Sequence, residues 1–181
     1  MVKELKAVIL GDCNVGKTTI LKKIMKLPIY NVATTINLDI EKYVNHDISI
    51  NFWDTSGQER FDSINRNYIK NSNIILLVFD INNYSTYMKL KNYWLPECKK
   101  YLDDDDTTYF IIGNKMDLFP NHPIHRYKIE NQEIIVLSAL NDNLNNLLFK
   151  IYKKSLEMTP KISSNIINIS KVNIYKNKCC N

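Results

Sequence analysis

Hydrophobic residues follow two kinds of pattern along the chain, and the two kinds alternate. Short runs that are apolar throughout or at every second position predict β-strands at residues 3–10, 38–44, 48–54, 73–81, 107–114 and 133–139. Longer segments with apolar residues three or four positions apart predict helices at residues 16–27, 85–102 and 143–158. This alternation is typical of an α/β domain, so we expect a six-stranded, mostly parallel sheet flanked by helices.

The connections between these segments refine the expected fold. A short polar turn joins the second and third predicted strands, which therefore form a hairpin. The fourth and fifth are apolar throughout, as in strands buried on both faces of a parallel sheet. Pro96 lies inside the predicted helix 85–102 and is expected to kink or restart it, because proline has no N–H to donate.

Both periodic patterns end near Pro160. We expect one domain at residues 1–158 and a flexible, lysine-containing tail at 159–181 that ends in a double cysteine. Residues 161–181 carry four lysines and no acidic residue, so a net charge of +1 remains for the rest of the chain. A nearly neutral body argues against a nucleic-acid partner.

The compartment is predicted from three absences in the sequence. No apolar run reaches the roughly 20 residues that span a bilayer, and the N-terminus has no secretory signal pattern. The four cysteines have neither zinc-site spacing nor the arrangement of a disulfide framework. We therefore expect a cytoplasmic protein in a reducing environment.

Residues 11–18, GDCNVGKT, fit the pattern G-x-x-x-x-G-K-[ST], and they lie between a predicted strand and a predicted helix. In this motif, backbone N–H groups and the helix N-terminus face phosphate groups. Lys17 adds a positive charge, and the Thr18 hydroxyl can ligate Mg²⁺. The motif therefore predicts the phosphate loop of a P-loop NTPase.

Two further motifs end predicted strands. In WDTSG, Asp54 can hold Mg²⁺ through water, and the N–H of Gly57 can bind a γ-phosphate. In GNKMD, Asp117 can accept two hydrogen bonds from N1–H and N2–H₂ of guanine, which adenine cannot supply in that geometry. This predicts GTP as the nucleotide and weakens the alternative of an ATP-using phosphate-loop enzyme.

The motifs GDCNVGKT, DTSG, NKMD and SA occur in the order seen in small GTPases of the Ras superfamily, which residues 3–158 resemble. WDTSGQERF, NYIKNS, LLVFDI and the double cysteine are most similar to Rab proteins. The resemblance implies a small G-protein domain that binds GTP, slowly hydrolyses it to GDP, and recruits effectors in vesicle traffic.

The resemblance also implies the roles of individual residues. It assigns GTP or GDP binding to Asn14, Val15, Gly16, Lys17, Thr18, Thr19, Thr35, Gly57, Asn114, Lys115, Asp117, Ser138, Ala139 and Leu140. Mg²⁺ would be held by Thr18 and Thr35 directly and by Asp54 through water. Gln58 would be the catalytic residue, because it corresponds to the glutamine that orients the attacking water in Ras.

Partners follow from the same resemblance. Effectors, an exchange factor and a GTPase-activating protein would bind through switch regions at 28–40 and 55–72. No arginine lies between residues 27 and 40, which indicates hydrolysis at roughly 10⁻⁴ to 10⁻³ per second without an activator. Cys179 and Cys180 would be prenylated by the prenylation machinery and would anchor the protein peripherally to the cytosolic face of an intracellular membrane.

Some positions depart from the family pattern. Asn37 replaces the glycine of the switch I signature, Ile40 replaces its phenylalanine, and Leu140 replaces the lysine of S-A-K. Asn37 and Leu140 favour an alternative, a GTP-binding scaffold that hardly hydrolyses. The spacing of the first motifs is similar to that in Arf proteins, so a divergent Arf-like GTPase is a second alternative. Only 20 residues separate Asp117 from Ser138, so the helix expected there must be short.

Overall fold

The structure is a computed structural model. It describes residues 2–29, 38–55, 67–102, 107–129 and 132–160, and the backbone of 173–176. The strands are β1 (Lys3–Leu10), β2 (Asp39–Asn45), β3 (Ile48–Asp54), β4 (Ile74–Asp80), β5 (Thr108–Asn114), β6 (Ile134–Val136) and β7 (Asn173–Lys176). The helical elements are α1 (Lys17–Ile24), α3 (Tyr84–Lys89), the π-helix η1 (Leu90–Trp94), α4 (Leu95–Tyr101), the 3₁₀ turns η3 (Met116–Leu118) and η4 (Ile124–Arg126), and α5 (Asn145–Glu157). In the part of the chain described here, no helix is both long and apolar enough to cross a membrane.

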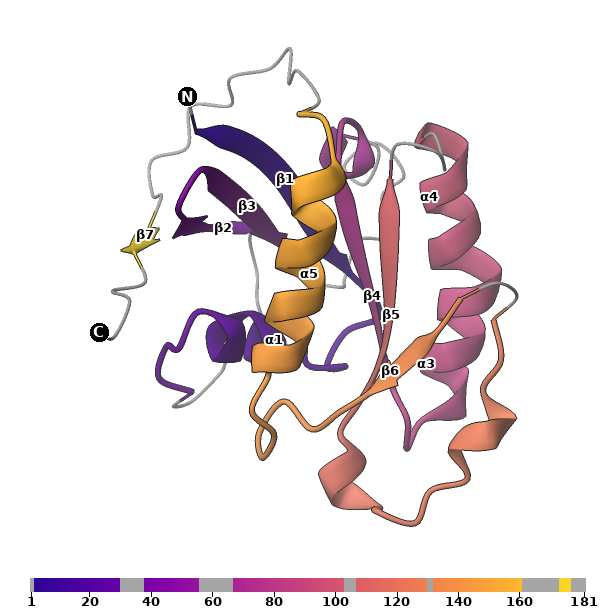
Figure 1. Cartoon of the computed structure of the whole chain (residues 1–181). Helices are drawn as coiled ribbons and strands as arrows, with labels where there is room; N and C mark the ends of the chain where they lie inside the picture. Colours follow the sequence, from indigo (N-terminus) through magenta and orange to yellow (C-terminus); the bar gives the residue numbers. More distant parts are fainter. Residues whose placement is uncertain are drawn as a thin grey trace.

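The strands form a single sheet in the order β6-β5-β4-β1-β3-β2-β7 (Figure 1). The six predicted strands are β1 to β6, and all of their pairings are parallel except the β2–β3 hairpin. Because β1, β3, β4 and β5 run in the same direction, their carboxyl ends meet at one edge of the sheet. The predicted α/β fold is confirmed, and this edge is where the sequence motifs lie.

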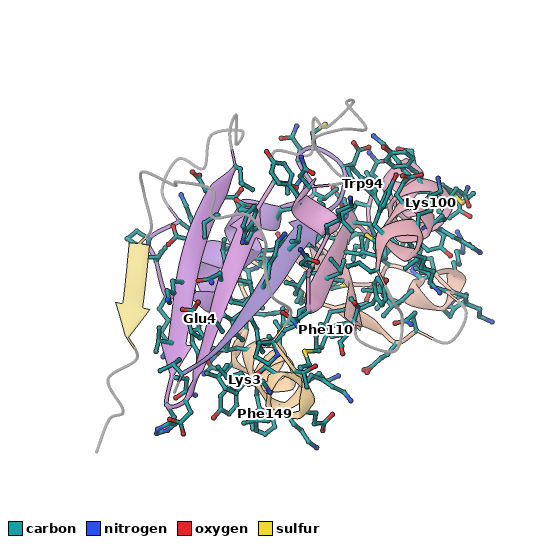
Figure 2. The ribbon with its side chains drawn as sticks, turned by 90° about the horizontal axis from the view of Figure 1, so that it is seen from above. Lys3, Glu4, Trp94, Lys100, Phe110 and Phe149 are labelled. Carbon is teal, nitrogen blue, oxygen red and sulfur yellow. The ribbon has the colours of Figure 1, made fainter. Side chains whose placement is uncertain are left out.

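Helices cover both faces of the sheet, which explains the uninterrupted apolar runs. In β4, Ile74, Leu76 and Val78 belong to a core cluster with residues of α1 and α5. Ile75 and Leu77 point the other way and pack with residues of α3, η1 and α4. Figure 2 accordingly shows α5 on one side of the sheet and the helix that carries Trp94 on the other. Each fully buried aliphatic side chain contributes about 1.5–3 kcal/mol relative to an exposed one.

Helical structure continues through most of the predicted helix 85–102, and a new α-helical segment, α4, begins at Leu95, so the expected restart at Pro96 is confirmed. The turn of π-helix at η1 lies just before the proline, and the N–H of Leu95 donates to the carbonyl of Leu90 five residues earlier. Pro96 then falls in the first turn of α4, where its missing N–H costs little. The wider turn therefore accommodates the proline, and the single predicted helix becomes α3, η1 and α4.

Among the described residues between β5 and β6, which leave out 130 and 131, the helical elements are the single turns η3 and η4, so the helix expected there is reduced to these. Tyr127 lies between them and the sheet: its ring packs 5.1 Å from Phe79 and 4.9 Å from Tyr87. Its hydroxyl donates to the carbonyl of Ile81 at 2.7 Å. Aromatic side chains thus cover this part of the sheet where the chain is too short for a longer helix.

The tail differs from expectation in one segment. The sequence has no strand pattern after Pro160, but Asn173–Lys176 form β7, which pairs in parallel with β2 from Glu41 to Val44. An edge strand offers unpaired N–H and C=O groups that another segment can bind, and β2 offers such an edge. The six-stranded sheet of the domain therefore gains a seventh strand. Cys179 and Cys180 lie outside the described residues.

Candidate functional site

The phosphate loop connects β1 to α1 and depends on two glycines. Gly11 has a φ of 146°, and a Cβ there would lie 2.2 Å from the carbonyl oxygen of Val78. Gly16 has a φ of 97°, and a Cβ there would lie 2.3 Å from Nδ2 of Asn114. Both distances are far below van der Waals contact, so any other residue would move the loop away from β4 and β5. The glycines allow the loop to approach the end of the sheet.

Lys17 is the charged group inside this loop. It begins α1 and is only 4% exposed. Its ammonium donates to the carbonyls of Gly11 at 3.1 Å and Asp12 at 2.9 Å. Asn14, with a φ of 60°, is also in the left-handed region. The site therefore combines a buried ammonium, a loop in which several residues have positive φ, and a helix N-terminus. These features together suit the binding of an anion.

Thr18 and Asp54 meet although they are far apart in sequence. Thr18 lies in the first turn of α1, Asp54 ends β3, and the Thr18 hydroxyl donates to Oδ2 of Asp54 at 2.5 Å. Asp54 is 1% exposed. A hydroxyl and a carboxylate are the hard oxygen ligands that Mg²⁺ prefers, so these residues fit the predicted ion. The third predicted ligand, Thr35, lies outside the described residues, as do Gly57 and the predicted catalytic Gln58.

Asn114 links three segments at the end of β5. It is 2% exposed. Its Nδ2 donates to the carbonyl of Val15 at 2.9 Å, and its Oδ1 accepts from the N–H of Ala139 at 3.0 Å. The predicted base-binding residue therefore fastens the phosphate loop to the loop after β6.

Asp117 is oriented by Ser138. The Ser138 hydroxyl donates to Oδ1 of Asp117 at 2.5 Å and accepts from the N–H of Asn141 at 3.1 Å. The N–H of Ser138 donates in turn to Oδ2 of Asp142 at 2.7 Å. A carboxylate fixed in this way can accept hydrogen bonds from neighbouring N–H groups on a ligand. Sequence reasoning missed Asp142, whose only signal is its position four residues after Ser138.

These loops surround a cavity of about 120 Å³. It is lined by Gly16, Thr19, Asn114, Lys115, Asp117, Leu118, Ala139 and Leu140. Leu118 is the only one of these that sequence reasoning missed, although its place directly after NKMD could have indicated it. Leu118 is 65% exposed and Leu140 is 57% exposed, so both present apolar surface at the mouth of the cavity. Apolar walls with a carboxylate between them suit a flat heterocycle that carries N–H donors.

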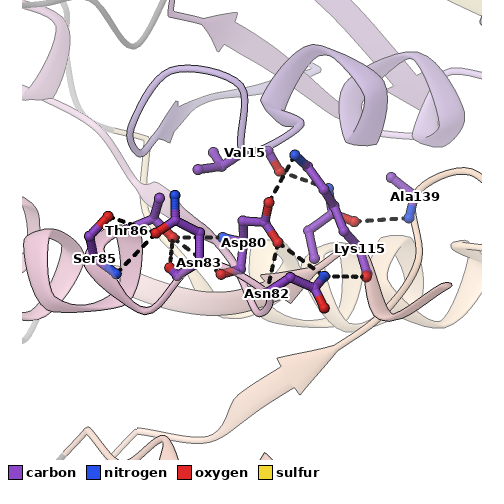
Figure 3. Close-up of polar contacts among 9 residues, drawn as sticks. Val15, Asp80, Asn82, Asn83, Ser85, Thr86, Lys115 and Ala139 are labelled. Atoms are coloured by element: carbon purple, nitrogen blue, oxygen red, sulfur yellow. Dashed lines mark hydrogen bonds and ion pairs between the residues drawn. The ribbon is translucent and has the colours of Figure 1, made fainter. Parts of the chain in front are cut away.

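Lys115 brings two more unpredicted residues to the site (Figure 3). Its ammonium forms an ion pair with Oδ2 of Asp80 at 2.9 Å, and its carbonyl accepts from Nδ2 of Asn82 at 2.8 Å. Asp80 ends β4, and Asn82 follows in the turn before α3. On the phosphate side, Lys89 of α3 forms an ion pair with Asp12 at 2.7 Å.

Comparison with known proteins agrees with this geometry. The sequence profile of the Ras family matches residues 6–160. RabP of Dictyostelium discoideum is 28% identical over 183 aligned positions, which cover 97% of this chain and 76% of RabP. RabN1 of the same organism is 34% identical over 152 positions, 74% of this chain and 70% of RabN1. RABC2b of Arabidopsis thaliana is 30% identical over 116 positions, 62% of this chain and 57% of RABC2b.

A parallel sheet with a glycine-dependent phosphate loop, the Thr18–Asp54 pair and the Asp117 cavity at one edge is the architecture of a P-loop protein. The chain belongs to the Ras family of small GTPases. Its relatives include several Rab-related proteins, so the predicted Rab-like character is confirmed. The alignment with RABC2b spans little more than half of that protein.

Proposed function

We propose that the chain is a Rab-like switch that binds GTP and GDP with Mg²⁺ and hydrolyses GTP slowly. The observation that carries this proposal is the position of Asn114, which joins the phosphate loop to the base cavity through Val15 and Ala139. One nucleotide can therefore place its phosphates at Lys17 and its guanine at Asp117. Mg²⁺, held by Thr18 and Thr35 and through water by Asp54, would neutralise phosphate charge.

Slow hydrolysis follows from the distribution of arginine. The chain has Arg60, Arg66 and Arg126, and none lies in the 27–40 stretch where a built-in arginine finger would act. Without that charge, hydrolysis runs at roughly 10⁻⁴ to 10⁻³ per second, against several per second with an activator. Such a rate suits a timed switch that effectors, an exchange factor and an activator read through segments 28–40 and 55–72.

Single-turnover hydrolysis of GTP tests this function. The protein is loaded with GTP, and GDP is quantified over hours for the wild type and for Gln58→Leu. We expect a slow rate that the substitution reduces at least about tenfold, because the attacking water is no longer oriented. Equal rates in the two proteins, or no hydrolysis by the wild type, would support the hydrolysis-poor scaffold instead.

We propose further that the switch acts in vesicle traffic from a lipid anchor. The similarity to several Rab-related proteins and the adjacent cysteines Cys179 and Cys180 support this proposal. Two prenyl chains make anchoring stable where one is marginal. The intact mass of protein from eukaryotic cells should show two added lipids in the wild type and none after both cysteines are replaced by serine. An unmodified wild-type mass would refute the anchor.

A further inference from the structure

Lys115 has a strained backbone. Its φ of 69° lies in the left-handed region, and it is the residue between β5 and η3. A residue with a Cβ in this conformation costs on the order of 1 kcal/mol, and such strain persists only where surrounding contacts hold it. Neighbouring groups must therefore hold Lys115 in this conformation, and their positions indicate its role in the site.

Two groups from the turn after β4 hold this residue at both ends. Nδ2 of Asn82 donates to the Lys115 carbonyl at 2.8 Å, which fixes the backbone. Oδ2 of Asp80 lies 2.9 Å from the Lys115 ammonium, which fixes the end of the side chain. The Asp80 side chain is 14% exposed and that of Lys115 is 30% exposed, so solvent screens this pair less than a surface pair.

Asp80 is itself rigidly placed (Figure 3). Its Oδ1 accepts from the N–H of Asn82 at 2.9 Å and from Nδ2 of Asn82 at 3.2 Å. Its backbone N–H donates to the Thr86 hydroxyl at 3.0 Å, and Asn83 caps α3 through the N–H of Ser85 at 3.2 Å. The carboxylate is therefore built into the β4–α3 turn and does not depend on Lys115 for its position.

We propose that Asp80 and Asn82 are positioning residues for guanine binding, acting through Lys115. Lys115 lines the base cavity. With its ammonium paired to Asp80, its alkyl stem is held as one wall of that cavity while its charge remains satisfied. A preordered wall removes the entropy cost of ordering a lysine when the base binds. The pair thereby slows release of the nucleotide. This inference rests on the proposed guanine site.

A double-mutant cycle on the release of fluorescent GDP tests the inference. Asp80→Asn removes the charge but keeps an acceptor for Asn82, and Lys115→Met keeps the alkyl stem but removes the ammonium. We expect Asp80→Asn to release GDP about fivefold faster than the wild type. The same change in the Lys115→Met background should have almost no effect, because the partner is gone. Asp47→Asn, an exposed carboxylate in the β2–β3 turn, is the matched control.

The outcomes separate positioning from general structural support. Equal effects of Asp80→Asn in both backgrounds would show that it acts without Lys115 and would overturn the inference. No effect in either background would overturn it as well. Asn82→Ala provides a second variant and should also accelerate release. If the wild type failed to bind GDP, the proposed function would fail too, whereas normal GDP binding with a neutral Asp80→Asn would refute the inference alone.

Discussion

The hydroxyl of Thr18 donates a hydrogen bond of 2.5 Å to the carboxylate of Asp54, although 36 positions separate the two residues. The parallel pairing of β1 with β3 brings them together, because it aligns Ile9 with Asp54 at the end of the sheet where the phosphate loop begins. Two of the oxygen groups that the sequence predicts as magnesium ligands are thus in direct contact.

Thr18→Ala should uncouple nucleotide release from magnesium. In the wild type, removing Mg²⁺ with EDTA should accelerate release of GDP at least about tenfold, because the ion no longer neutralises phosphate charge. In the variant, release should already be fast, and EDTA should change it little. Thr159→Ala, an exposed threonine at the end of the described domain, is the control and should behave like the wild type. A strong EDTA effect that survives in Thr18→Ala would contradict the assigned ligand.

Gly16 and Asn14 of the phosphate loop differ in how much room a side chain has. Both have positive φ, but a Cβ at Gly16 would collide with the Asn114 amide. Gly16→Ala should lower the free energy of unfolding by about 2–4 kcal/mol, through backbone strain and the displaced amide. Asn14→Gly should change it by less than about 0.5 kcal/mol, because relief of strain offsets the extra entropy of the unfolded chain. Urea unfolding measures both, and equal effects would disprove the steric argument.

The contribution of Lys6 to the free energy of unfolding should increase in alkaline solution. Burial lowers the pKa of Lys6 from its ordinary value of 10.5 to about 8. The ammonium lies 4.3 Å from the centre of the Trp53 ring and donates to the carbonyl of Lys70 at 2.9 Å. Between pH 8 and 10.5 the unfolded chain binds the Lys6 proton that the folded chain has lost, so the contribution of Lys6 to the free energy of unfolding rises with pH across this window.

Comparison with Lys6→Met isolates this contribution. The free energy of unfolding of the wild type relative to the variant should rise by on the order of 1 kcal/mol from pH 7.5 to pH 10. This figure is below the full shift because solvent still reaches part of the side chain. Urea unfolding at several pH values gives the difference, and one that stays constant with pH would contradict the lowered pKa.

Cys13 and Cys98 should differ sharply in reactivity. Cys13 is exposed in the phosphate loop and Cys98 is buried. Burial, together with the nearby Glu97 carboxylate, raises the pKa of the Cys98 thiol to about 12. At pH 8 only about one Cys98 in 10⁴ is therefore a thiolate. Brief treatment with iodoacetamide and peptide mass spectrometry should show Cys13 alkylated and Cys98 intact. Comparable labelling of the two would indicate that the native core opens readily.

The sequence was sufficient to predict those site residues whose role is set by their immediate neighbours in the chain. The phosphate loop, Asp54 and Asp117 could be identified because each motif carries its chemistry within a few residues, next to a strand with a clear apolar pattern. Groups that act across the chain left no such signal. Asp80 and Asn82 look like ordinary turn residues until the β4–β5 pairing sets Asp80 opposite Asn114, next to Lys115.

Two elements of the fold were beyond sequence reasoning for physical reasons. The π-helical turn at η1 resolves a local conflict between Pro96 and a continuous helix, and sequence patterns show only the conflict. The strand β7 exists because the β2 edge is open to pairing, which is a property of the assembled sheet. Neither the period of the tail nor its composition predicts this pairing.

The central claim is that the cavity between Asp117 and the phosphate loop selects guanine. Displacement of fluorescent GDP from the protein by GDP or ADP tests it most directly. The account predicts that ADP competes at least about 10³-fold more weakly than GDP, because the carboxylate would face no N–H donors, and that Asp117→Ala narrows this difference. Equal competition by ADP and GDP in the wild type would contradict the claim.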